Sequence, residues 1–523
     1  RYVVRRHQFG WGPGELHVHT ADAWTEVAQI PQLSRLVSLD AHDNRHEYAV
    51  IAPEPPAAER SAGEARLMFH WTTTDADGAR WDAQIGVSLT EHSKLLRVTH
   101  ALQCSQAQRL LAFDSFMLHA LARDEAVFPG LEWLVDDEVS SSTLDIAPEH
   151  ADRIRYVVHP NMVTVPAIGI HAPWGTVGLL WDLHQKWDGQ HDRPAVVFAS
   201  PDRFHNYGTH VAGLFVPGVP EWVPVNQREA HTPYPMPAGQ PLRLECQILA
   251  DAGATDALAP LDAWLDAHGL PDPAALPHGS YPAEIEFSMQ GYLQSLWIPA
   301  ERMWWTSKGG GIMSEQDRPP LYVADLLIGA QLAPAESVRQ ACRDRAAEVL
   351  PLLGRDARID ALRFGNRFDL ALVQPGLVAS LLQARDGDGM WAFDADHLGE
   401  GPFTGLDYRD LGPDQAVELG TTAIHTYQVL RYARIAGDRT AYQQMLPTLE
   451  RMTRFRVPRA AQVWEVPVHT PDILAASQAL DAFLEAYRFS SDPRWLEAAV
   501  RQARLGLPFI YLWDDPAQPY LVG

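Results

Sequence analysis

The period of the hydrophobic pattern changes once along this chain of 523 residues, and that change constrains the fold more than any other feature. Up to about residue 250, short runs of β-branched and aromatic residues, such as 156–158 and 195–198, alternate with turns rich in Pro, Gly, Asn and Asp. From about residue 283 onward, apolar residues recur with the 3.6-residue period of a helix. The sequence therefore predicts a β-rich part followed by a helical part.

Residues 1–250 are predicted to form an antiparallel β-sandwich, because many short strands separated by turn signals favour two packed sheets. One helix is predicted within it, near 105–123. Residues 251–282 are rich in Ala and Asp at first and in Pro near the end. This composition predicts a helical, Pro-rich linker with one short helix at 258–267.

Residues 283–523 are predicted to form an α/α toroid that carries the catalytic site. Helices are predicted at 284–298, 320–331, 335–352, 367–385, 415–436, 439–455, 471–488 and 493–506. The clearest is 471–488, for which Thr470 is the predicted N-cap, Pro471 the first helical residue and Asp472 an acidic residue of the first turn.

A weak internal repeat supports the toroid. The short connections 436–439 and 490–493 each join two helices, and an aromatic residue, Tyr442 or Trp495, follows each one. Repeated helical hairpins predict an (α/α)6-type barrel in which each pair packs against its neighbours. A complete ring of this type holds about twelve helices. Since eight are predicted here, we expect the ring to be incomplete in this chain. The stretch 509–513 supports this expectation, because it is too apolar to be a free tail.

Charge and composition limit the partners. The chain has 66 acidic and 42 basic residues, a formal net charge of -24. A surface this negative repels phosphate, which argues against nucleic acids and anionic membranes as partners. No apolar run approaches the ~20 residues that span a bilayer. The three cysteines, at 104, 246 and 342, are too far apart in sequence for a CxxC zinc motif. We expect no metal and no cofactor, and the oligomeric state is left open.

The first residues bear on location. The chain begins with Arg1 and shows neither an initiator Met nor a signal-peptide pattern. Either a leader has been removed or the sequence is a fragment. We expect a soluble protein, with a secreted or periplasmic location favoured.

The segment 462–472 holds the main catalytic candidate. Glu465 directly follows Trp464 in a loop between two predicted helices. A carboxyl group against an indole is partly desolvated, which raises its pKa and keeps it protonated near neutral pH. A general acid that protonates a glycosidic oxygen needs this property. The alternative is a surface Glu beside a Trp that packs in the core.

The region from Leu419 to Leu480 resembles the glucoamylase family and related inverting six-hairpin glycosidases and phosphorylases. The order of features carries the resemblance: a helix ending at 432–438, a second helix containing 446–450, the Trp464–Glu465 loop and then an apolar helix. The resemblance implies that Glu465 is the general acid and that a β-sandwich and a linker precede the barrel. It places the general base in a late helix, beyond Gly523.

Other residues are predicted to contact the substrate. Trp304 and Trp305 precede a triglycine and would stack on sugar rings, unless they pack in the core. Asp317 and Arg318 are the nearest match, in reversed order, to an Arg-Asp pair of the glucoamylase-like family. Trp464, His469, Glu418, His425 and Tyr427 complete the predicted substrate-binding set.

Two other functional classes compete with a glycoside hydrolase. His425 lies seven residues after Glu418 on one helix face, and Tyr427 points away from that face. A His and a Tyr are also the acid-base pair of many polysaccharide lyases, for which His469 and Asn366 are further candidates. The other competitor is a non-catalytic carbohydrate-binding protein, which would keep aromatic subsites. The aromatic and polar runs at 181–188 and 128–133 could reach the mouth of the barrel, although turn and core roles are the default.

Two motifs bear on metals and packing. Gln383 followed by Gly389 and Trp391 resembles the glutamine–tryptophan motif of α/α toroids, which implies a structural role. Calcium binding by the same segment is disfavoured, because the EF-hand spacing fails. His17 and His19 share one strand face, as a pair of metal ligands would, but no third ligand is identified.

Overall fold

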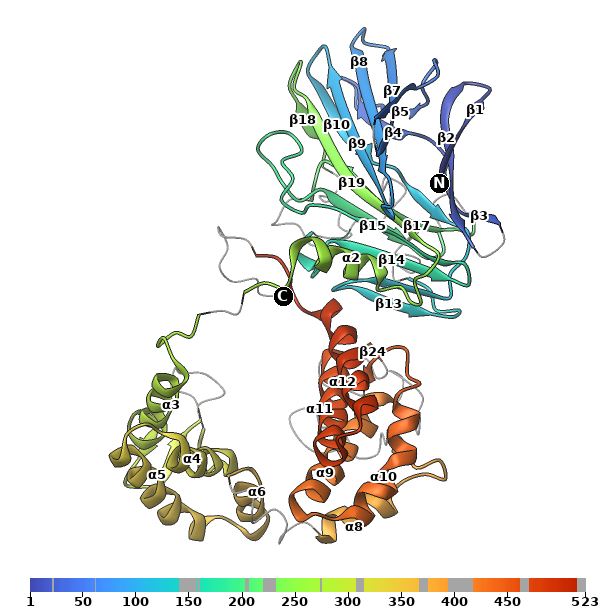
Figure 1. Ribbon diagram of the computed structural model, residues 1–523. Helices are drawn as coiled ribbons and strands as arrows, with labels where there is room; N and C mark the ends of the chain where they lie inside the picture. The colour runs from blue at the N-terminus through green and yellow to red at the C-terminus, as the bar shows by residue number, and fades with distance from the viewer. Residues whose placement is uncertain are drawn as a thin grey trace. The chain divides into compact units, whose positions relative to one another are not determined.

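The computed structural model (Figure 1) divides into two compact units. The first contains Arg1–Pro271 together with Pro508–Gly523, and the second contains Asp272–Leu507. The structure describes residues 1–20, 23–61, 63–140, 158, 160–202, 207–219, 232–272, 275–306, 315–365, 375–393, 417–460 and 470–514. These residues form two large antiparallel sheets and ten α-helices, so the protein belongs to the mixed β and α class. The finer class, a sandwich followed by a toroid, stays a prediction.

One sheet has ten strands in the order β1-β2-β3-β11-β17-β10-β4-β5, with β16 paired to β17 and β18 paired to β10. Its strands are β1 (Tyr2–His7), β2 (Gly10–His19), β3 (Trp24–Ile30), β4 (Ser34–Leu39), β5 (Arg45–Val50), β10 (Gln108–Asp114), β11 (Leu118–Ala120), β16 (Ala195–Ala199), β17 (His210–Val216) and β18 (Tyr234–Met236).

The other large sheet has nine strands in the order β13-β12-β14-β15-β19-β9-β8-β7-β6. Its strands are β6 (Ala57–Ser61), β7 (Glu64–Thr74), β8 (Arg80–Thr90), β9 (Leu95–Cys104), β12 (Glu125–Phe128), β13 (Glu132–Val135), β14 (Ala167–Ala172), β15 (Gly175–Leu180) and β19 (Leu242–Asp251). Strands that follow one another in sequence are often neighbours in this sheet, as β6 to β9 are.

Both sheets contribute to one hydrophobic core. Along β2 and β9, buried residues alternate with more exposed ones, which is the period that places every second side chain on the core face. Trp81 of β8, Phe113 of β10 and Phe116 are fully buried in this core. The shared core explains why the β-rich part folds as one unit.

The helix predicted near 105–123 is not found, because these residues form β10 and β11. Strand β10 lies inside its sheet and pairs with β4, β17 and β18. A strand covered on both faces is apolar along much of its length, and such a run cannot be told from a buried helix by its period alone. That ambiguity is the physical reason for the error.

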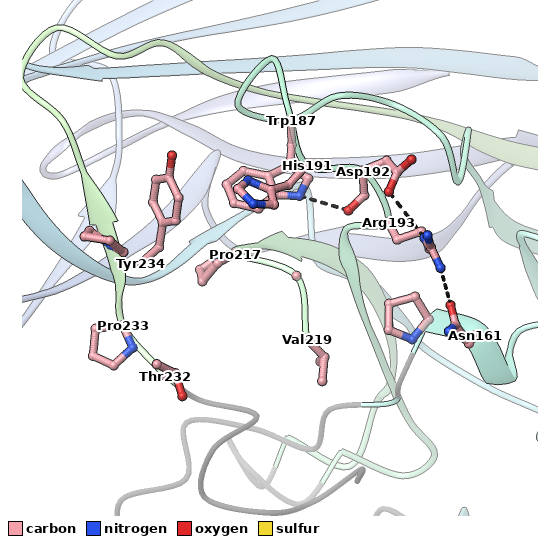
Figure 2. A pocket seen from close by; sticks show the side chains of 13 residues that line it. Asn161, Trp187, His191, Asp192, Arg193, Pro217, Val219, Thr232, Pro233 and Tyr234 are labelled. Carbon is pink, nitrogen blue, oxygen red and sulfur yellow. Dashed lines mark hydrogen bonds and ion pairs between the residues drawn. The ribbon is translucent and has the colours of Figure 1, made fainter. Parts of the chain in front are cut away.

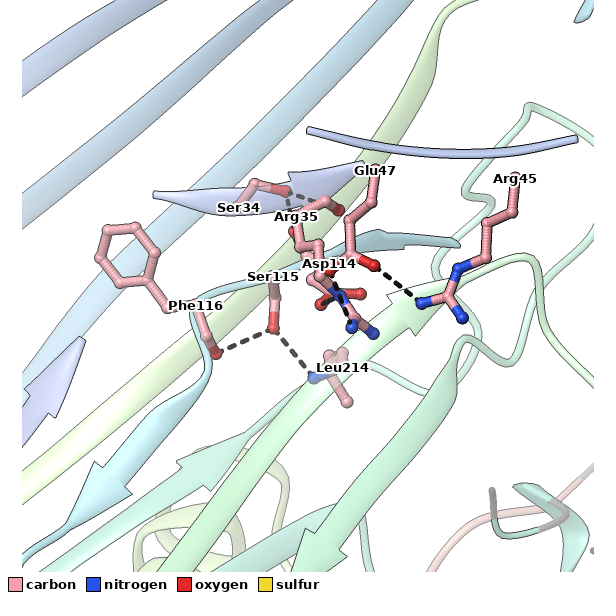
Figure 3. Close-up of polar contacts among 8 residues, drawn as sticks. All are labelled: Ser34, Arg35, Arg45, Glu47, Asp114, Ser115, Phe116 and Leu214. Atoms are coloured by element: carbon pink, nitrogen blue, oxygen red, sulfur yellow. Dashed lines mark hydrogen bonds and ion pairs between the residues drawn. The ribbon is translucent and has the colours of Figure 1, made fainter. Parts of the chain in front are cut away.

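A buried ion pair joins β4 to β10 (Figure 3). Arg35 Nε donates to Asp114 Oδ2 at 3.2 Å, and the two residues are only 8% and 2% exposed. Ser34 Oγ also donates to the Asp114 carbonyl at 2.6 Å, and the Leu214 N–H of β17 donates to Ser115 Oγ at 2.9 Å. Three neighbouring strands are therefore linked by side chains as well as by their backbone ladder.

Helix α2 (Ala259–His268) packs against β14 and β15, close to where the sequence predicts a short helix. Gly178 of β15 allows this approach, since a Cβ there would lie 2.3 Å from Pro260 Cγ. The segment Pro508–Trp513 also belongs to this first unit. Thr164 Oγ1 donates to the Pro508 carbonyl at 2.6 Å, and the Trp513 indole donates to the Val163 carbonyl at 2.7 Å.

The helices of the second unit pack around two separate hydrophobic cores. One core is surrounded by α3 (Tyr281–Gln290), α4 (Pro320–Leu332), α5 (Glu336–Val349) and α6 (Arg355–Gly365), the last of which was not predicted. The other is surrounded by α8 (Pro375–Gln383), α9 (Leu419–Ala436), α10 (Arg439–Met452), α11 (Ile473–Ser490) and α12 (Pro493–Gly506). No helix among the described residues is long and apolar enough to cross a membrane.

The predicted repeat is visible in the second core. Asp438 caps α10 and Asp492 caps α12, each through its side chain. The Trp495 indole donates to the Tyr442 hydroxyl at 3.1 Å, so the two aromatic residues that follow the connections contact each other. The hairpins α9–α10 and α11–α12 are thus built alike and packed together.

Candidate functional site

The described residues on either side of the predicted general acid, Glu465, pair with each other. Trp464, Glu465 and His469 lie outside the described residues, so their roles stay predictions. On either side of them, β23 (Arg459–Ala460) pairs with β24 (Thr470–Pro471). The described residues on either side of Glu465 are therefore joined by a two-stranded ladder.

The β23–β24 pair lies against the beginnings of two helices. A Cβ on Gly420, in the first turn of α9, would lie 2.7 Å from the Ala460 Cβ of β23. Glycine is what allows this close approach. The N–H of Asp472, which precedes α11, donates to the Pro458 carbonyl at 2.8 Å. The starts of α9 and α11 and the β23–β24 pair thus meet at one place.

Asp472, and not Thr470, is the N-cap of α11. Thr470 and Pro471 belong to β24, and Asp472 Oδ1 accepts from the Leu474 N–H at 2.7 Å. The prediction placed the cap too early because Pro471 suits the first position of a helix as well as the edge of a short strand. Asp472 is 7% exposed, and burial raises the pKa of its carboxyl.

A second buried carboxylate stands at the start of α9. Glu418 is 2% exposed, and its Oε1 accepts from Thr421 Oγ1 at 2.7 Å. Glu418 is in the predicted substrate-binding set, whereas Asp472 was predicted only as part of a helix start. Two buried acidic residues therefore stand at the starts of α9 and α11, which meet at the β23–β24 pair.

His425 and Tyr427 of α9 have different surroundings. The His425 ring packs 5.3 Å from the Trp391 ring, and burial lowers the pKa of the imidazole. The Tyr427 hydroxyl instead accepts from Arg431 at 3.1 Å. The contacts described for the two residues do not bring them together, so the acid-base pair that a lyase needs gains no support from this geometry.

The Trp391 of the glutamine–tryptophan motif joins two helices through hydrogen bonds. The Trp391 indole donates to the Leu381 carbonyl of α8 at 3.2 Å, and the Thr422 hydroxyl of α9 donates to the Trp391 carbonyl at 3.3 Å. Nearby, a cavity of about 280 Å³ is lined by Asp386, Asp388, Met390, Val417, Arg451, Arg454 and Phe455. Its Asp388 is paired with Arg451 at 2.7 Å.

Trp304 does not fit the predicted role in substrate binding. It is fully buried among α3 to α6, and its indole donates to the Tyr292 carbonyl at 2.7 Å. Both of its faces are used by the core, which leaves none for a sugar ring. Trp305 is partly exposed, and Asp317 is exposed on the short strand β22 (Gln316–Asp317). Arg318 donates to the Arg302 and Glu301 carbonyls at 2.9 and 2.8 Å.

The two histidines near the start of the chain, His17 and His19, have different contacts. The donor atoms of Glu15, His17 and Glu26 lie within 4.8 Å of one another, so Glu26 on the next strand supplies the third group that the sequence could not show. Arg5 already binds both Glu15 oxygens, at 2.5 and 2.9 Å, and a metal ion would compete with that guanidinium. His19 packs against Trp24 instead.

A separate aromatic cavity lies in the first unit (Figure 2). It has a volume of about 350 Å³, and sequence segments that are far apart line it. Figure 2 shows Trp187 and His191 together, with Tyr234 to one side and Arg193 and Asn161 to the other. The remaining lining residues are Pro160, Asp192, Pro217, Gly218, Val219, Thr232, Pro233 and Pro235.

Ring contacts hold the aromatic wall of this cavity. His191 stacks on Trp187 with ring centres 5.5 Å apart, and Tyr234 meets Trp187 edge to face at 5.0 Å. The Trp187 indole donates to the Asp192 carbonyl at 3.1 Å. Such contacts fix the rings before any ligand arrives, which reduces the entropic cost of binding.

Asp188 contacts two of these aromatic side chains, His191 and Tyr234. It is 6% exposed, and its Oδ2 lies 2.6 Å from His191 Nδ1 and 2.9 Å from the Tyr234 hydroxyl. Burial opposes ionisation of Asp188, but hydrogen bonds from His191, Gln190 and Tyr234 outweigh it and lower the pKa. Burial and the neighbouring Asp188 raise the pKa of Tyr234 to about 12, so the phenol stays a hydrogen-bond donor.

The charged groups beside the cavity largely neutralise one another. Asp192 accepts from Lys186 at 2.7 Å and from Arg193 Nε at 3.3 Å. Arg193 also donates to Asn161 Oδ1 at 2.7 Å. Of the segments that form this cavity, the sequence singled out only the aromatic and polar loop 181–188. The partners from β18 and from the turn after β17 are distant in sequence, and no local pattern marks them.

Comparisons with known proteins give weak similarities. No protein-family model matches the chain, and no curated protein matches it. The chain is similar to the α-N-acetylgalactosaminidase NagBb from Bifidobacterium bifidum, with 9% identity and a TM-score of 0.30, over 56% of this chain and 41% of that one. It is also similar to a galactose mutarotase related enzyme from Lactobacillus acidophilus, with 7% identity and a TM-score of 0.27, over 49% of this chain and 99% of that one. Similarity at this level assigns neither a fold nor a function.

Proposed function

We propose that this protein is a carbohydrate-active enzyme, an inverting glycoside hydrolase with Glu465 as its general acid. The aromatic cavity of the first unit is the observation that carries the carbohydrate part. Flat aromatic rings and prolines line it, together with a few polar groups. A pyranose presents an apolar face that stacks on such rings and hydroxyl groups that bond to side chains such as Asn161.

The charges around the cavity favour a neutral sugar over a uronate. Lys186 and Arg193 are both bound to Asp192, and Asp188 is an ionised carboxylate next to the rings. A sugar carboxylate would need a cation to neutralise it.

The hydrolytic part rests on Glu465. The sequence resembles that of inverting glycosidases around Trp464 and Glu465, and the described residues on either side of this segment, Ala460 and Thr470, pair beside the buried residues Glu418 and Asp472. In the proposed reaction, Glu465 protonates the leaving oxygen while a carboxylate activates a water molecule. The two groups of an inverting pair stand about 6.5–9.5 Å apart.

Two measurements test this proposal. The wild-type chain is assayed for release of reducing ends from neutral oligosaccharides, with and without phosphate, because a phosphorylase would yield a sugar phosphate. Glu465→Gln is then compared with wild type. We expect kcat to fall about 10²- to 10⁴-fold, with binding of the oligosaccharide retained. Unchanged activity in this variant would falsify the role of Glu465.

A non-catalytic sugar-binding protein is the second candidate, because the aromatic cavity exists without Glu465. It predicts binding by the wild-type chain and no product from any oligosaccharide. Isothermal titration with neutral and with uronate oligosaccharides would show the binding preference. The assay of reducing ends then separates the two candidates.

A further inference from the structure

A second cavity of the first unit lies between helix α2 and the strands β15 and β19. It has a volume of about 230 Å³, and residues from the end of β15, the turn after it, β19 and α2 line it. Sites for drug-sized ligands usually have volumes of about 300–1,000 Å³. The ligand that fits this cavity is therefore small, of the size of a single sugar ring.

Contacts within the first unit hold the walls of this cavity in place. The Gln185 amide donates to the Glu245 carbonyl at 3.0 Å, and its oxygen accepts from the Glu245 N–H at 2.8 Å, which ties the turn to β19. Helix α2 packs directly on β14 and β15. The His268 ring stacks on the Trp264 ring of α2, with ring centres 4.5 Å apart. A cavity with walls fixed in this way costs little entropy to fill.

Two hydrogen-bond donors of the cavity have no protein partner. Trp264 is 6% exposed, and its indole N–H keeps contact with solvent but has no hydrogen-bond partner among the described residues. By contrast, the buried indoles of Trp81 and Trp133 in the same unit both donate to carboxylates. The side-chain amide of Gln247 in β19 also has no partner within the described parts of the chain. Both groups are available to a ligand.

Two carboxylates in the lining supply acceptors. Asp182 Oδ1 accepts from the His184 N–H at 2.9 Å, and Glu245 Oε1 accepts from Arg97 at 2.6 Å. The second oxygen of each carboxylate, Asp182 Oδ2 and Glu245 Oε2, bonds to no described residue. The described lining contains no Lys or Arg. The cavity thus combines unused donors with unused acceptors and has no cation of its own.

This combination selects the class of ligand. An anion would meet two carboxylates and no cation. An ammonium group would bind the carboxylates, but it only donates hydrogen bonds and would leave the N–H groups of Trp264 and Gln247 unmatched. A sugar hydroxyl both donates and accepts, so it matches both kinds of group. The apolar face of a sugar ring can also pack against the apolar lining, which includes Leu180.

We propose that this cavity is a binding site for one neutral sugar ring, separate from the aromatic cavity. The two cavities use different residues of one stretch of chain: Asp182 and Gln185 line this one, whereas Trp187 and His191 line the aromatic one. The inference goes beyond the proposed function. It does not depend on Glu465, because every residue that carries it belongs to the β-rich unit.

NMR of the full chain with ¹⁵N-labelled tryptophan tests the site directly. The Trp264 indole resonance is the one that Trp264→Phe removes, and His268→Ala, which removes the stacked ring, identifies it a second time by its shift. The probes are the methyl α- and β-glycosides of glucose and galactose. We expect at least one of them to shift the Trp264 resonance saturably. Gln247→Met should raise the Kd from that shift about 2- to 12-fold, through the loss of one hydrogen bond.

Gln84→Met is the matched control, because Gln84 lies on β8 of the same sheet and lines neither cavity. It should leave the Kd unchanged, and so should His191→Ala in the aromatic cavity. A Trp264 resonance that no glycoside shifts overturns the inference. A resonance that responds only to methylammonium chloride, or that stops responding to the glycosides in His191→Ala, overturns it as well. Hydrolysis by wild type and Glu465→Gln tests the proposed function separately.

Discussion

Asp188 Oδ2 lies 2.6 Å from Nδ1 of His191, a contact between a buried carboxylate and a mostly exposed ring. The contact orients the imidazole, which also stacks on Trp187. With Nδ1 held by Asp188, Nε2 is the nitrogen that a sugar hydroxyl can reach. Among the three rings of the aromatic wall, His191 is the most exposed, since Tyr234 is half-buried and Trp187 is buried.

Replacing His191 should weaken sugar binding without unfolding the protein. Its side chain is 63% exposed, so His191→Ala removes a contact surface and leaves the core intact. We expect about a tenfold loss of affinity for a neutral oligosaccharide, measured by isothermal titration. His70→Ala is the matched control, because His70 is 58% exposed and bonded to Asp82 in the other sheet. Equal affinities for the two variants would contradict a binding role for the cavity.

Tyr234→Phe should lower stability by removing one donor to Asp188. The hydrogen bond is 2.9 Å long and its acceptor is ionised, so its loss should cost about 1.5–3 kcal/mol. Urea unfolding of the first unit measures this. The difference in unfolding free energy between wild type and Tyr234→Phe should be constant between pH 6 and 9. The pKa of Tyr234 is about 12, so its hydroxyl keeps its proton over this range. A change in stability that appears only in alkaline solution would argue against this hydrogen bond.

Arg35→Met should destabilise the first unit strongly. The substitution leaves the Asp114 carboxylate in the core without its guanidinium partner, and breaking a buried pair in this way costs about 3–5 kcal/mol. Arg45→Met is the control, since Arg45 pairs with Glu47 near the surface and should contribute about 0–1 kcal/mol. Similar unfolding midpoints for the two variants would show that the buried pair has no special weight.

Asp472→Asn should stabilise the protein at neutral pH. Burial raises the pKa of this carboxyl, so the folded state holds the proton more tightly than the unfolded state does. Wild type therefore loses stability as the pH rises from the unfolded pKa through the folded pKa, and the amide does not. The difference in melting temperature should be small near pH 3 and larger at pH 7. A constant difference across this range would contradict ionisation of Asp472 as its source.

The sequence predicted the order of the parts better than their details. The change of period located the β-rich and helical parts, and the helices from Leu419 to Gly506 begin and end near their predicted positions. The run at 105–123 was mistaken for a helix because a strand inside a sheet is apolar on both faces. Packing against distant strands decides that structure, and no local pattern records it.

The same limit applies to the candidate sites. Trp304 carries the same local signal whether it stacks on a sugar or fills a core, and only the packing of α3 to α6 decides between the two. The aromatic cavity unites Trp187, His191 and Tyr234, which are brought together by the sheet. Asp472 was visible as an acidic residue before an apolar helix, but its burial depends on β23, β24 and α9.

The path of the chain between the two units has a practical consequence. Residues up to Pro271 and residues from Pro508 belong to the same unit, so the helical unit is an insertion in the β-rich one. One proteolytic nick near residue 272 leaves the insert attached through its other end. Two nicks, near 272 and near 507, are needed to release it, and the segment Pro508–Trp513 then stays on the β-rich unit through hydrogen bonds such as that from Trp513 to Val163.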